Sequence, residues 1–494
     1  MLFPSEVFLF VFLPVVLGVY YLLLRKTKHL KNIFLLVASL FFYAWGEPQN
    51  VWLMVGVILF NWFFGILVDK VRDHKVPVRI LMTVMVLTNV GILGWYKYSE
   101  FVMLQVNRFL HTEFTVPDVT LPIGISFFTF QAMSYVIDVY RGHGKVQKNP
   151  LQVGLYISLF PQLIAGPIVR YETIADQIEN RVENLADFNA GVTRFCIGLG
   201  KKVLIANNMA LIADNAFGLI INNEFQASVG MAWLGAIAYT LQIFFDFSGY
   251  SDMAIGLGQM FGFHFEENFK YPYISATVSE FWRRWHISLS SWLRDYVYIP
   301  LGGNRCSKVR KYFNIMVTFL TSGIWHGASW HFVLWGALQG IFIVIGDMLR
   351  PAKTKFHTVF HVKTQSVGFR CGQVCMTYLL FLVSFTFFRA PTISDGVYYL
   401  ERIVRHFDIW TLLDGSVYTL GLDAKEMLVF VIAVAILWIV DWYYQKKKAY
   451  FDTLVKNQCL AVQYLIVLTL FVMILVFGVY GEGYNASEFI YFQF

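Results

Sequence analysis

Charged residues are scarce in this chain of 494 residues. Asp, Glu, Lys and Arg make up 14% of the sequence, whereas hydrophobic residues make up 57%, and the mean hydropathy is +0.55. This balance lies far outside that of soluble globular domains and argues against a water-soluble fold. The sequence also lacks a P-loop, a dinucleotide-type glycine pattern and a repeat of fixed period. Any chemistry must therefore use a membrane domain.

Cysteine is sparse as well. The five cysteines are odd in number and scattered (Cys196, Cys306, Cys371, Cys375 and Cys459), so no disulfide framework or zinc-ribbon spacing appears. The formal net charge of +7 could suggest a nucleic-acid partner, but the basic residues form short clusters between apolar stretches. Such clusters indicate membrane topology and contact with anionic lipid headgroups, and we expect no nucleic acid.

Long apolar stretches dominate the sequence instead. They run at 6–24, 31–45, 51–68, 79–96, 121–139, 151–168, 188–206, 228–246, 313–322, 329–346, 371–389, 427–443 and 460–480. Several are too short to cross about 30 Å of hydrocarbon, so some must be re-entrant or buried inside the protein. We expect an all-α polytopic membrane protein with a single integral membrane domain over residues 1–494. Its core motifs lie at 121–346, with peripheral helices at 1–120 and 371–494.

The basic clusters alternate along the chain and predict its orientation. Arg25 to Lys31 is rich in Lys and Arg, Glu47 to Asn50 has none, and Lys70 to Arg79 is rich again. The positive-inside rule then places the N-terminus outside. A basic loop at Lys446, Lys447, Lys448 and Lys456 predicts a cytoplasmic turn before the last span and an external C-terminus over 481–494. The first stretch, 7–24, has no cleavage signal and is predicted to be a retained span.

The region from Phe247 to Gly303 departs from the regular pattern of spans. If 281–296 is a continuous helix, Trp282, His286, Leu289 and Leu293 share one face, and Arg284, Ser288, Ser291 and Asp295 share another. Such a helix fits a re-entrant position. The alternative is an amphipathic helix held at the headgroups by its Trp and Arg residues.

His326 is the first candidate for chemistry. It lies between two apolar stretches, where ionisable residues are costly and usually face a cavity. An imidazole suits a general base that takes a proton from a hydroxyl. Gly323 and Gly327 would let a substrate or a neighbouring backbone approach closely. The alternative is a histidine hydrogen-bonded in the core.

His286 is the second candidate, with a structural helix histidine as its alternative. His331 follows His326 by five residues, which does not suit a helical metal pair, so no metal is expected. Asp246 and Asp252 could mark a helix break at a polar cavity, although ion-pair or capping roles are favoured for them, as for Asp138 with Arg141. The stretch Pro300 to Arg305, with basic residues beyond it, could bind a phosphate-bearing donor or serve as a topology signal.

These motifs together resemble those of the membrane-bound O-acyltransferase family, and within it the alginate O-acetyltransferase branch. The resemblance rests on the run FWRRWHISLSSWLRDY at 281–296 with YIPLGG at 298–303, and on LPIGISFFTF at 121–130, SYVID at 134–138 with Tyr140 and Arg141, FPQLIAGP at 160–167, WHGA at 325–328 and FIYFQF at 489–494. It covers nearly the whole chain.

The resemblance implies a ring of tilted helices with re-entrant segments around a central tunnel. It also implies a catalytic His326, with His286 as the second histidine of the site. Substrate-binding residues are then expected in the matching motifs: Trp285, Ser288, Arg294, Asp295, Trp325 and Gly327. The implied donor is acetyl-CoA, with no permanently bound cofactor. The implied acceptor is an extracytoplasmic protein or polysaccharide, and the implied location is a bacterial cytoplasmic membrane.

Two other functions stay open at this point. A sister branch with the same two histidines transfers D-alanine to teichoic acid, although the WRRW and PLGG motifs favour the acetyl branch. A transporter or flippase could instead use Asp138, Asp246, Asp252 and His326 as a transport relay. The sequence does not identify the polysaccharide.

Overall fold

A computed structural model describes residues 1–25, 27–222, 228–405, 413–447 and 457–479, together with Trp410, Val455 and Phe489. Helices account for nearly all the regular structure, and no strand occurs within these ranges. The prediction of an all-α fold is therefore confirmed. Lys26, Lys448, Lys456 and the C-terminal stretch 481–494 other than Phe489, all used in the sequence predictions, lie outside the described residues.

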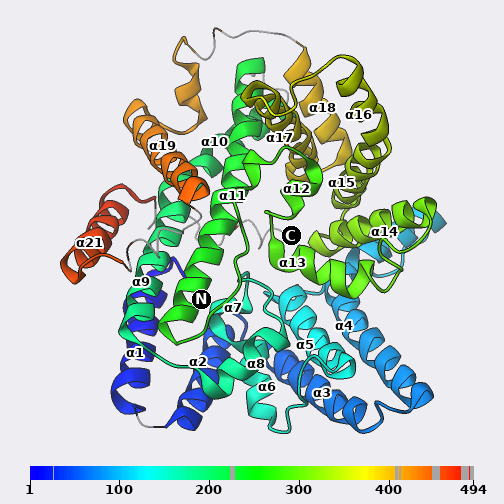
Figure 1. The fold of residues 1–494 in the computed structure, drawn as a ribbon, viewed down its shortest axis with the longest axis vertical. Helices are drawn as coiled ribbons and strands as arrows, with labels where there is room; N and C mark the ends of the chain where they lie inside the picture. The colour runs from blue at the N-terminus through cyan, green and yellow to red at the C-terminus, as the bar shows by residue number, and fades with distance from the viewer. Residues whose placement is uncertain are drawn as a thin grey trace.

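The first half of the chain builds one side of the molecule and its long central helix (Figure 1). Its elements are η1 (Phe8–Phe12), α1 (Leu13–Gly18), η2 (Val19–Leu23), α2 (Lys28–Gly46), α3 (Val51–Lys70), α4 (Lys75–Leu110), α5 (Ile125–Arg141), α6 (Pro150–Ser158), α7 (Phe160–Leu163), α8 (Tyr171–Asn180), α9 (Leu185–Gly200), η3 (Lys201–Ala206), α10 (Asn207–Ile221) and α11 (Val229–Met260). Helix α11 runs through the middle of the view and packs against α9 and α10.

The elements of the second half are η4 (Pro272–Ile274), α12 (Val278–Trp282), α13 (Ile287–Leu293), η5 (Arg294–Tyr298), α14 (Lys308–His326), α15 (Trp330–Met348), α16 (Arg350–Val359), α17 (Val367–Arg389), α18 (Ile393–Val404), η7 (Ser416–Leu420), α19 (Ala424–Lys447) and α21 (Leu460–Phe477). This half packs against α11 through α17 and α18, and the end of its helix α14 contacts α4. The turn carrying α12 and α13 lies between α11 and α14 (Figure 1).

Within the described ranges, eight helical segments are long and apolar enough to cross a membrane. They are α2, α3, α4, the continuous run Leu185–Ile221, α11, α15, α17 and α21. The chain is thus a multi-pass membrane protein. The apolar windows 121–139 and 151–168 form α5 and the broken pair α6 and α7, most of whose side chains are buried. These two windows therefore lie inside the protein, as expected for some of the apolar segments.

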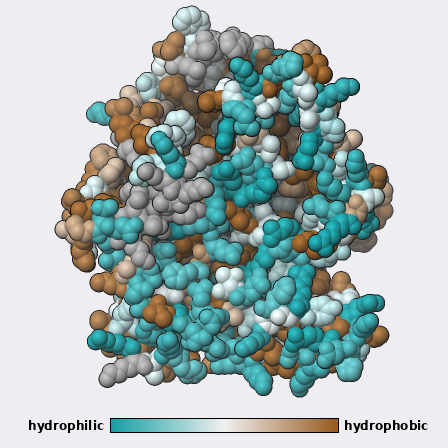
Figure 2. Space-filling model, viewed as in Figure 1, coloured by the Kyte–Doolittle hydropathy of each residue, from teal (hydrophilic) through white to brown (hydrophobic). Residues whose placement is uncertain are grey.

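Large apolar side chains cover much of the outer surface. Only 6% of the apolar window of α21 is buried inside the protein, and exposed side chains such as Phe10, Trp52 and Leu87 point away from the core. Figure 2 shows apolar residues gathered mostly along the edges of this face, with hydrophilic residues over its middle. An exposed apolar surface of this extent requires lipid around it.

Helix α11 carries buried acidic residues that are paired with cations. The Lys202 ammonium lies 2.7 Å from a carboxylate oxygen of Asp246, and the side chain of Asp246 is 1% exposed. Asp252 accepts hydrogen bonds from Arg194 and Lys201. The favoured ion-pair role for both aspartates is confirmed. The possible helix break is wrong, because α11 continues unbroken through both residues, and a buried charge with a partner needs no opening of the helix.

The predicted continuous helix over 281–296 is also wrong. The backbone is helical in α12, turns at 283–286, and resumes as α13 and η5. Asn268, from the loop that follows α11, lies against this turn, and its backbone oxygen accepts a hydrogen bond from the Ile287 N–H at 2.9 Å. This contact replaces an intrahelical bond, and the shared faces predicted from helical periodicity do not form.

Candidate active site

Close packing of α14 against α15 sets the position of His326. Gly323 of α14 and Gly336 of α15 face one another: a Cβ on Gly336 would lie 2.5 Å from the Phe319 carbonyl oxygen and 3.0 Å from the Gly323 Cα. A side chain at either glycine would push the helices apart. Helix α14 ends at His326, because the backbone of Gly327 is extended.

Aromatic rings surround the His326 imidazole. The ring centroids of Trp325 and Trp335 lie 4.9 Å from it, and that of Phe388 lies 5.3 Å away. His326 is 7% exposed. Gly327 packs under the Phe332 ring, which would clash with any added side chain. Gly323 therefore allows a neighbouring backbone to approach, and Gly327 allows an aromatic ring to approach. Protein atoms, and not open space, lie beside both glycines.

Two residues of α4 bind the end of α14. The Lys97 ammonium donates to the backbone oxygens of Trp325, at 2.6 Å, and His326, at 3.0 Å. The Tyr98 hydroxyl donates to the Ile324 oxygen. The last carbonyls of a helix have no intrahelical partner, and water is excluded from apolar surroundings. Lys97 and Tyr98 therefore satisfy three successive carbonyls beside the His326 ring.

A pocket of about 110 Å³ opens beside His326. Lys97 and Trp325 line it together with His326. The opposite wall is the turn into α5, residues 121–127, with Ile164. This turn belongs to one of the sequence motifs, so the structure brings the 121–130 and 325–328 motifs to one cavity.

His286 occupies the turn between α12 and α13 in a strained conformation. Its backbone lies in the left-handed region, with φ 43° and ψ 55°, which costs a residue with a side chain about 1–3 kcal/mol and persists only where the surroundings enforce it. The ring is buried at 1% exposure and packs edge-on against Phe247 at 4.6 Å.

Asn268 fixes the orientation and tautomer of the His286 ring. Its Oδ1 lies 3.2 Å from His286 Nδ1 and accepts hydrogen bonds from the backbone N–H and the hydroxyl of Ser288. Because Oδ1 can only accept, Nδ1 of His286 carries a proton and donates. In a neutral ring Nε2 is then an acceptor. A substrate group that meets Nε2 must bring its own N–H or O–H.

Trp325 joins the two histidine environments. Its ring centroid lies 4.9 Å from that of His326 and 6.1 Å from that of His286. Phe127, from the pocket wall, packs at 5.4 Å from Trp325 and 6.5 Å from His286. Of the residues predicted for the site, the structure therefore gathers His326, His286, Trp325, Ser288 and Gly327.

Trp285 is connected to His286 through two intervening aromatic rings, those of Phe269 and Phe247. Its ring packs within an aromatic cluster, at 5.1 Å from Phe269 and 5.4 Å from Phe281. Phe269 in turn packs at 5.0 Å from Phe247, which contacts His286. Trp285 is thus placed to support the His286 turn rather than to line the pocket.

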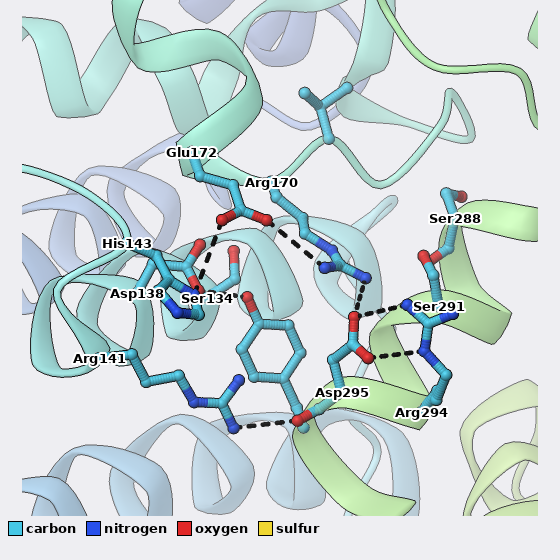
Figure 3. Close-up of polar contacts among 12 residues, drawn as sticks. Ser134, Asp138, Arg141, His143, Arg170, Glu172, Ser288, Ser291, Arg294 and Asp295 are labelled. Atoms are coloured by element: carbon cyan, nitrogen blue, oxygen red, sulfur yellow. Dashed lines mark hydrogen bonds and ion pairs between the residues drawn. The ribbon is translucent and has the colours of Figure 1, made fainter. Parts of the chain in front are cut away.

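Arg294 and Asp295 belong to a separate charged cluster at the C-terminal end of α5 (Figure 3). The Asp295 carboxylate forms two ion pairs: its Oδ2 lies 2.7 Å from a guanidinium nitrogen of Arg170, and its Oδ1 lies 2.7 Å from Nε of Arg294. The Arg294 side chain is 61% exposed. Burial by itself raises the pKa of Asp295, but its hydrogen bonds and charge contacts with Arg294 and Arg170 outweigh burial and lower that pKa. The carboxylate stays ionised at neutral pH.

The same cluster ties α5 to the turn after α13. The Tyr296 hydroxyl donates to Asp138 Oδ1 at 2.6 Å, and Arg141 donates to the backbone oxygen of Asp295 at 3.0 Å. Asp138 thus pairs with Tyr296, whereas the sequence suggested Arg141. The cluster fixes α5, which forms one wall of the pocket, against the segment that carries His286.

His331 lies apart from His326. Its Nδ1 is 2.9 Å from the Pro391 oxygen and 3.1 Å from the Ser329 hydroxyl. Among the described residues no group of three or more His, Cys, Asp or Glu side chains could hold a metal ion.

Sequence reasoning missed Lys97, Tyr98 and Asn268. Lys97 had a usable signal, since it follows the apolar window 79–96 within a helix of 36 residues, and ionisable residues in such helices mark functional sites by default. Asn268 had none, because it lies in a loop with no motif spacing to His286.

Comparison with known proteins gives a family match and full-length relatives. The family model described as MBOAT, membrane-bound O-acyltransferase family, matches residues 83–386. A probable alginate O-acetylase of Pseudomonas syringae is 40% identical over 91% of this chain and 84% of its own length. A peptidoglycan O-acetyltransferase of Helicobacter pylori is 34% identical over 82% of this chain and 80% of its own length.

A third relative covers less of the chain. A teichoic acid D-alanyltransferase of Streptococcus thermophilus is 32% identical over 47% of this chain and 58% of its own length. The full-length similarity therefore lies with proteins named for acetyl transfer.

Proposed function

Because the chain belongs to the membrane-bound O-acyltransferase family, and is therefore an acyltransferase, we propose that it transfers acetyl from acetyl-CoA for the O-acetylation of an extracytoplasmic polysaccharide. The observation that carries the proposal is the buried pair of histidines around Trp325, with a pocket beside His326. The relatives named as alginate and peptidoglycan O-acetyltransferases support acetyl as the group transferred. We place the enzyme in a bacterial cytoplasmic membrane.

His326 acts as the general base in this proposal. The imidazole takes the proton of an acceptor hydroxyl while the hydroxyl oxygen attacks the thioester carbonyl. The tetrahedral intermediate collapses, the C–S bond breaks, and the thiolate of coenzyme A leaves and takes the proton that His326 had accepted, which returns the imidazole to its neutral form. The products are an acetyl ester and the free thiol. The acceptor hydroxyl belongs to a partner protein or to the polysaccharide itself.

His286 positions the donor. With Nδ1 donating to Asn268, a neutral ring offers a hydrogen-bond acceptor at Nε2. That acceptor suits an amide N–H of the donor better than a developing oxyanion, which needs donors. The tautomer therefore favours donor positioning over oxyanion stabilisation.

D-alanyl transfer to teichoic acid is the second candidate. A relative with that name matches 47% of this chain. Purified enzyme supplied with acetyl-CoA or with a D-alanyl thioester separates the two. We expect the enzyme to turn over acetyl-CoA and not the D-alanyl thioester. Turnover of the D-alanyl thioester without turnover of acetyl-CoA would overturn the assignment.

We expect His286→Ala to lower acetyl transfer about 10²-fold while the folded yield in the membrane stays near that of the wild type. The reason is that His286 is assigned to donor positioning, and alanine keeps the Cβ, so the left-handed backbone at this residue is unchanged. Acetylated product and size-exclusion profile are the measurements. His331→Ala is the matched control, because His331 lies outside the site, and it should keep its activity. Full activity of His286→Ala would remove His286 from the mechanism.

We expect the turn at Arg72 and the end of α19 at Lys447 to face the cytoplasm, and the turn at Glu47 to face outward. The test introduces single cysteines at these positions in a variant without the five native cysteines and labels them with an impermeant maleimide. Glu47→Cys should react in intact cells. Arg72→Cys and Lys447→Cys should react only after permeabilisation. Labelling of Arg72→Cys and Lys447→Cys in intact cells would contradict this orientation.

A further inference from the structure

A groove of about 660 Å³ lies on α4, far along that helix from Lys97. Arg72, Lys75 and Arg79 line one end of it, and Tyr140 of α5 closes its side. Met82, Val86 and Leu87 line the remainder, together with Val78 and Thr83. The groove therefore has a basic end and an apolar end.

The two ends are separated along the helix axis. Arg79 and Val86 are seven residues apart on α4, which corresponds to about 10 Å at 1.5 Å per residue. Helices α3 and α4 are both candidate spans, so the turn between them, which carries Arg72, lies at a membrane surface. The basic end thus lies at headgroup depth and the apolar end within the hydrocarbon.

Two of the three cations at the basic end have no ion-pair partner among the described residues. Arg72 pairs with Asp69. Within the described part of the chain, Lys75 and Arg79 form no ion pair. Two exposed cations beside an apolar trough complement a ligand with an anionic head and a hydrocarbon tail.

We propose that this groove is a binding site for an anionic phospholipid, with its phosphate between Lys75 and Arg79 and an acyl chain along Met82 and Val86. The site is independent of the acyl-transfer chemistry, since it shares no lining residue with the pocket at His326. Its lipid would fix the α3–α4 turn against the end of α5.

The experiment measures which lipid stays with the purified full chain. Protein is reconstituted in vesicles containing equal phosphatidylglycerol and phosphatidylcholine, extracted, and its bound lipid is quantified by mass spectrometry. We expect phosphatidylglycerol to be retained preferentially. Because each basic residue near a membrane surface contributes about a fivefold preference for anionic lipid, the double variant Lys75→Gln/Arg79→Gln should lower that preference by about tenfold or more.

Two further variants keep the proposal falsifiable. Thr83→Trp fills the groove without altering charge and should also lower phosphatidylglycerol retention. Lys353→Gln/Lys355→Gln removes the same charge from exposed positions of α16 and should leave retention unchanged. Equal retention by the wild type and both groove variants would overturn the proposal, as would an equal loss in the α16 control. Displacement of the lipid by inorganic phosphate alone would identify a phosphate site and overturn the lipid site.

Discussion

His326→Gln is expected to lower the rate of acetyl transfer about 10²–10⁴-fold, the usual contribution of a general base. Glutamine can hydrogen-bond in place of the imidazole but cannot accept a proton as a base. His326 is 7% exposed, at the end of α14 and at the wall of the pocket. The substitution therefore removes the base and retains most of the packing.

The measurements are acetylated product, donor binding and size-exclusion profile of the purified variant. We expect donor binding to survive, because the thioester pocket does not depend on a proton acceptor. His326→Ala should be equally inactive. Product formation near the wild-type rate by His326→Gln would show that His326 is not the base, and the mechanism proposed above would be wrong.

Lys97→Met is expected to lower kcat about 10²-fold with little change in KM, the effect of displacing a catalytic group by about 1 Å. Methionine has a comparable length but no hydrogen-bond donors. The Lys97 ammonium binds the backbone oxygens of Trp325 and His326. Its loss leaves these two carbonyls without a partner in apolar surroundings and frees the helix end that carries His326. Lys97 is thus a positioning residue that acts through His326.

Three comparisons separate positioning from a general loss of structure. Lys97→Arg keeps a donor at this position and should restore at least part of the lost kcat. Tyr98→Phe removes the neighbouring contact to the Ile324 oxygen and should have a smaller effect, because the two carbonyls nearest the ring stay bound. In a His326→Gln background, Lys97→Met should have no further effect on the residual rate, since residues that act as a unit are non-additive. Wild-type kcat in Lys97→Met, or additive losses in the double variant, would contradict the positioning role.

Asp295→Asn is expected to reduce the thermal stability of the folded protein near neutral pH, as followed by a thermal unfolding scan. Arg294 and Arg170 lower the pKa of Asp295 in the folded state, so its stabilising contribution is present above the unfolded pKa and is lost as pH falls through the folded pKa. The wild type and the variant should therefore converge at acidic pH. A difference that persists unchanged there would contradict the assignment to this ion pair.

The sequence determined the membrane class and the first catalytic candidate. The thickness of the hydrocarbon sets the length of spans, so apolar windows alone gave their approximate positions. A histidine between apolar stretches is costly wherever the chain folds, and this cost singled out His326 without any structure. The motifs then pointed to the family, which the comparisons confirm.

The tertiary structure decided which residues meet these histidines. Lys97 contacts a carbonyl 228 residues away, and Asn268 contacts a ring 18 residues away across a turn. Helical periodicity reports only neighbours within a few turns, so it joined Trp282 to His286 on a continuous helix face. The Asn268 contacts and the left-handed backbone at His286 break that helix. These contacts follow from how α4, α11 and α14 pack, and local sequence carries no record of that packing.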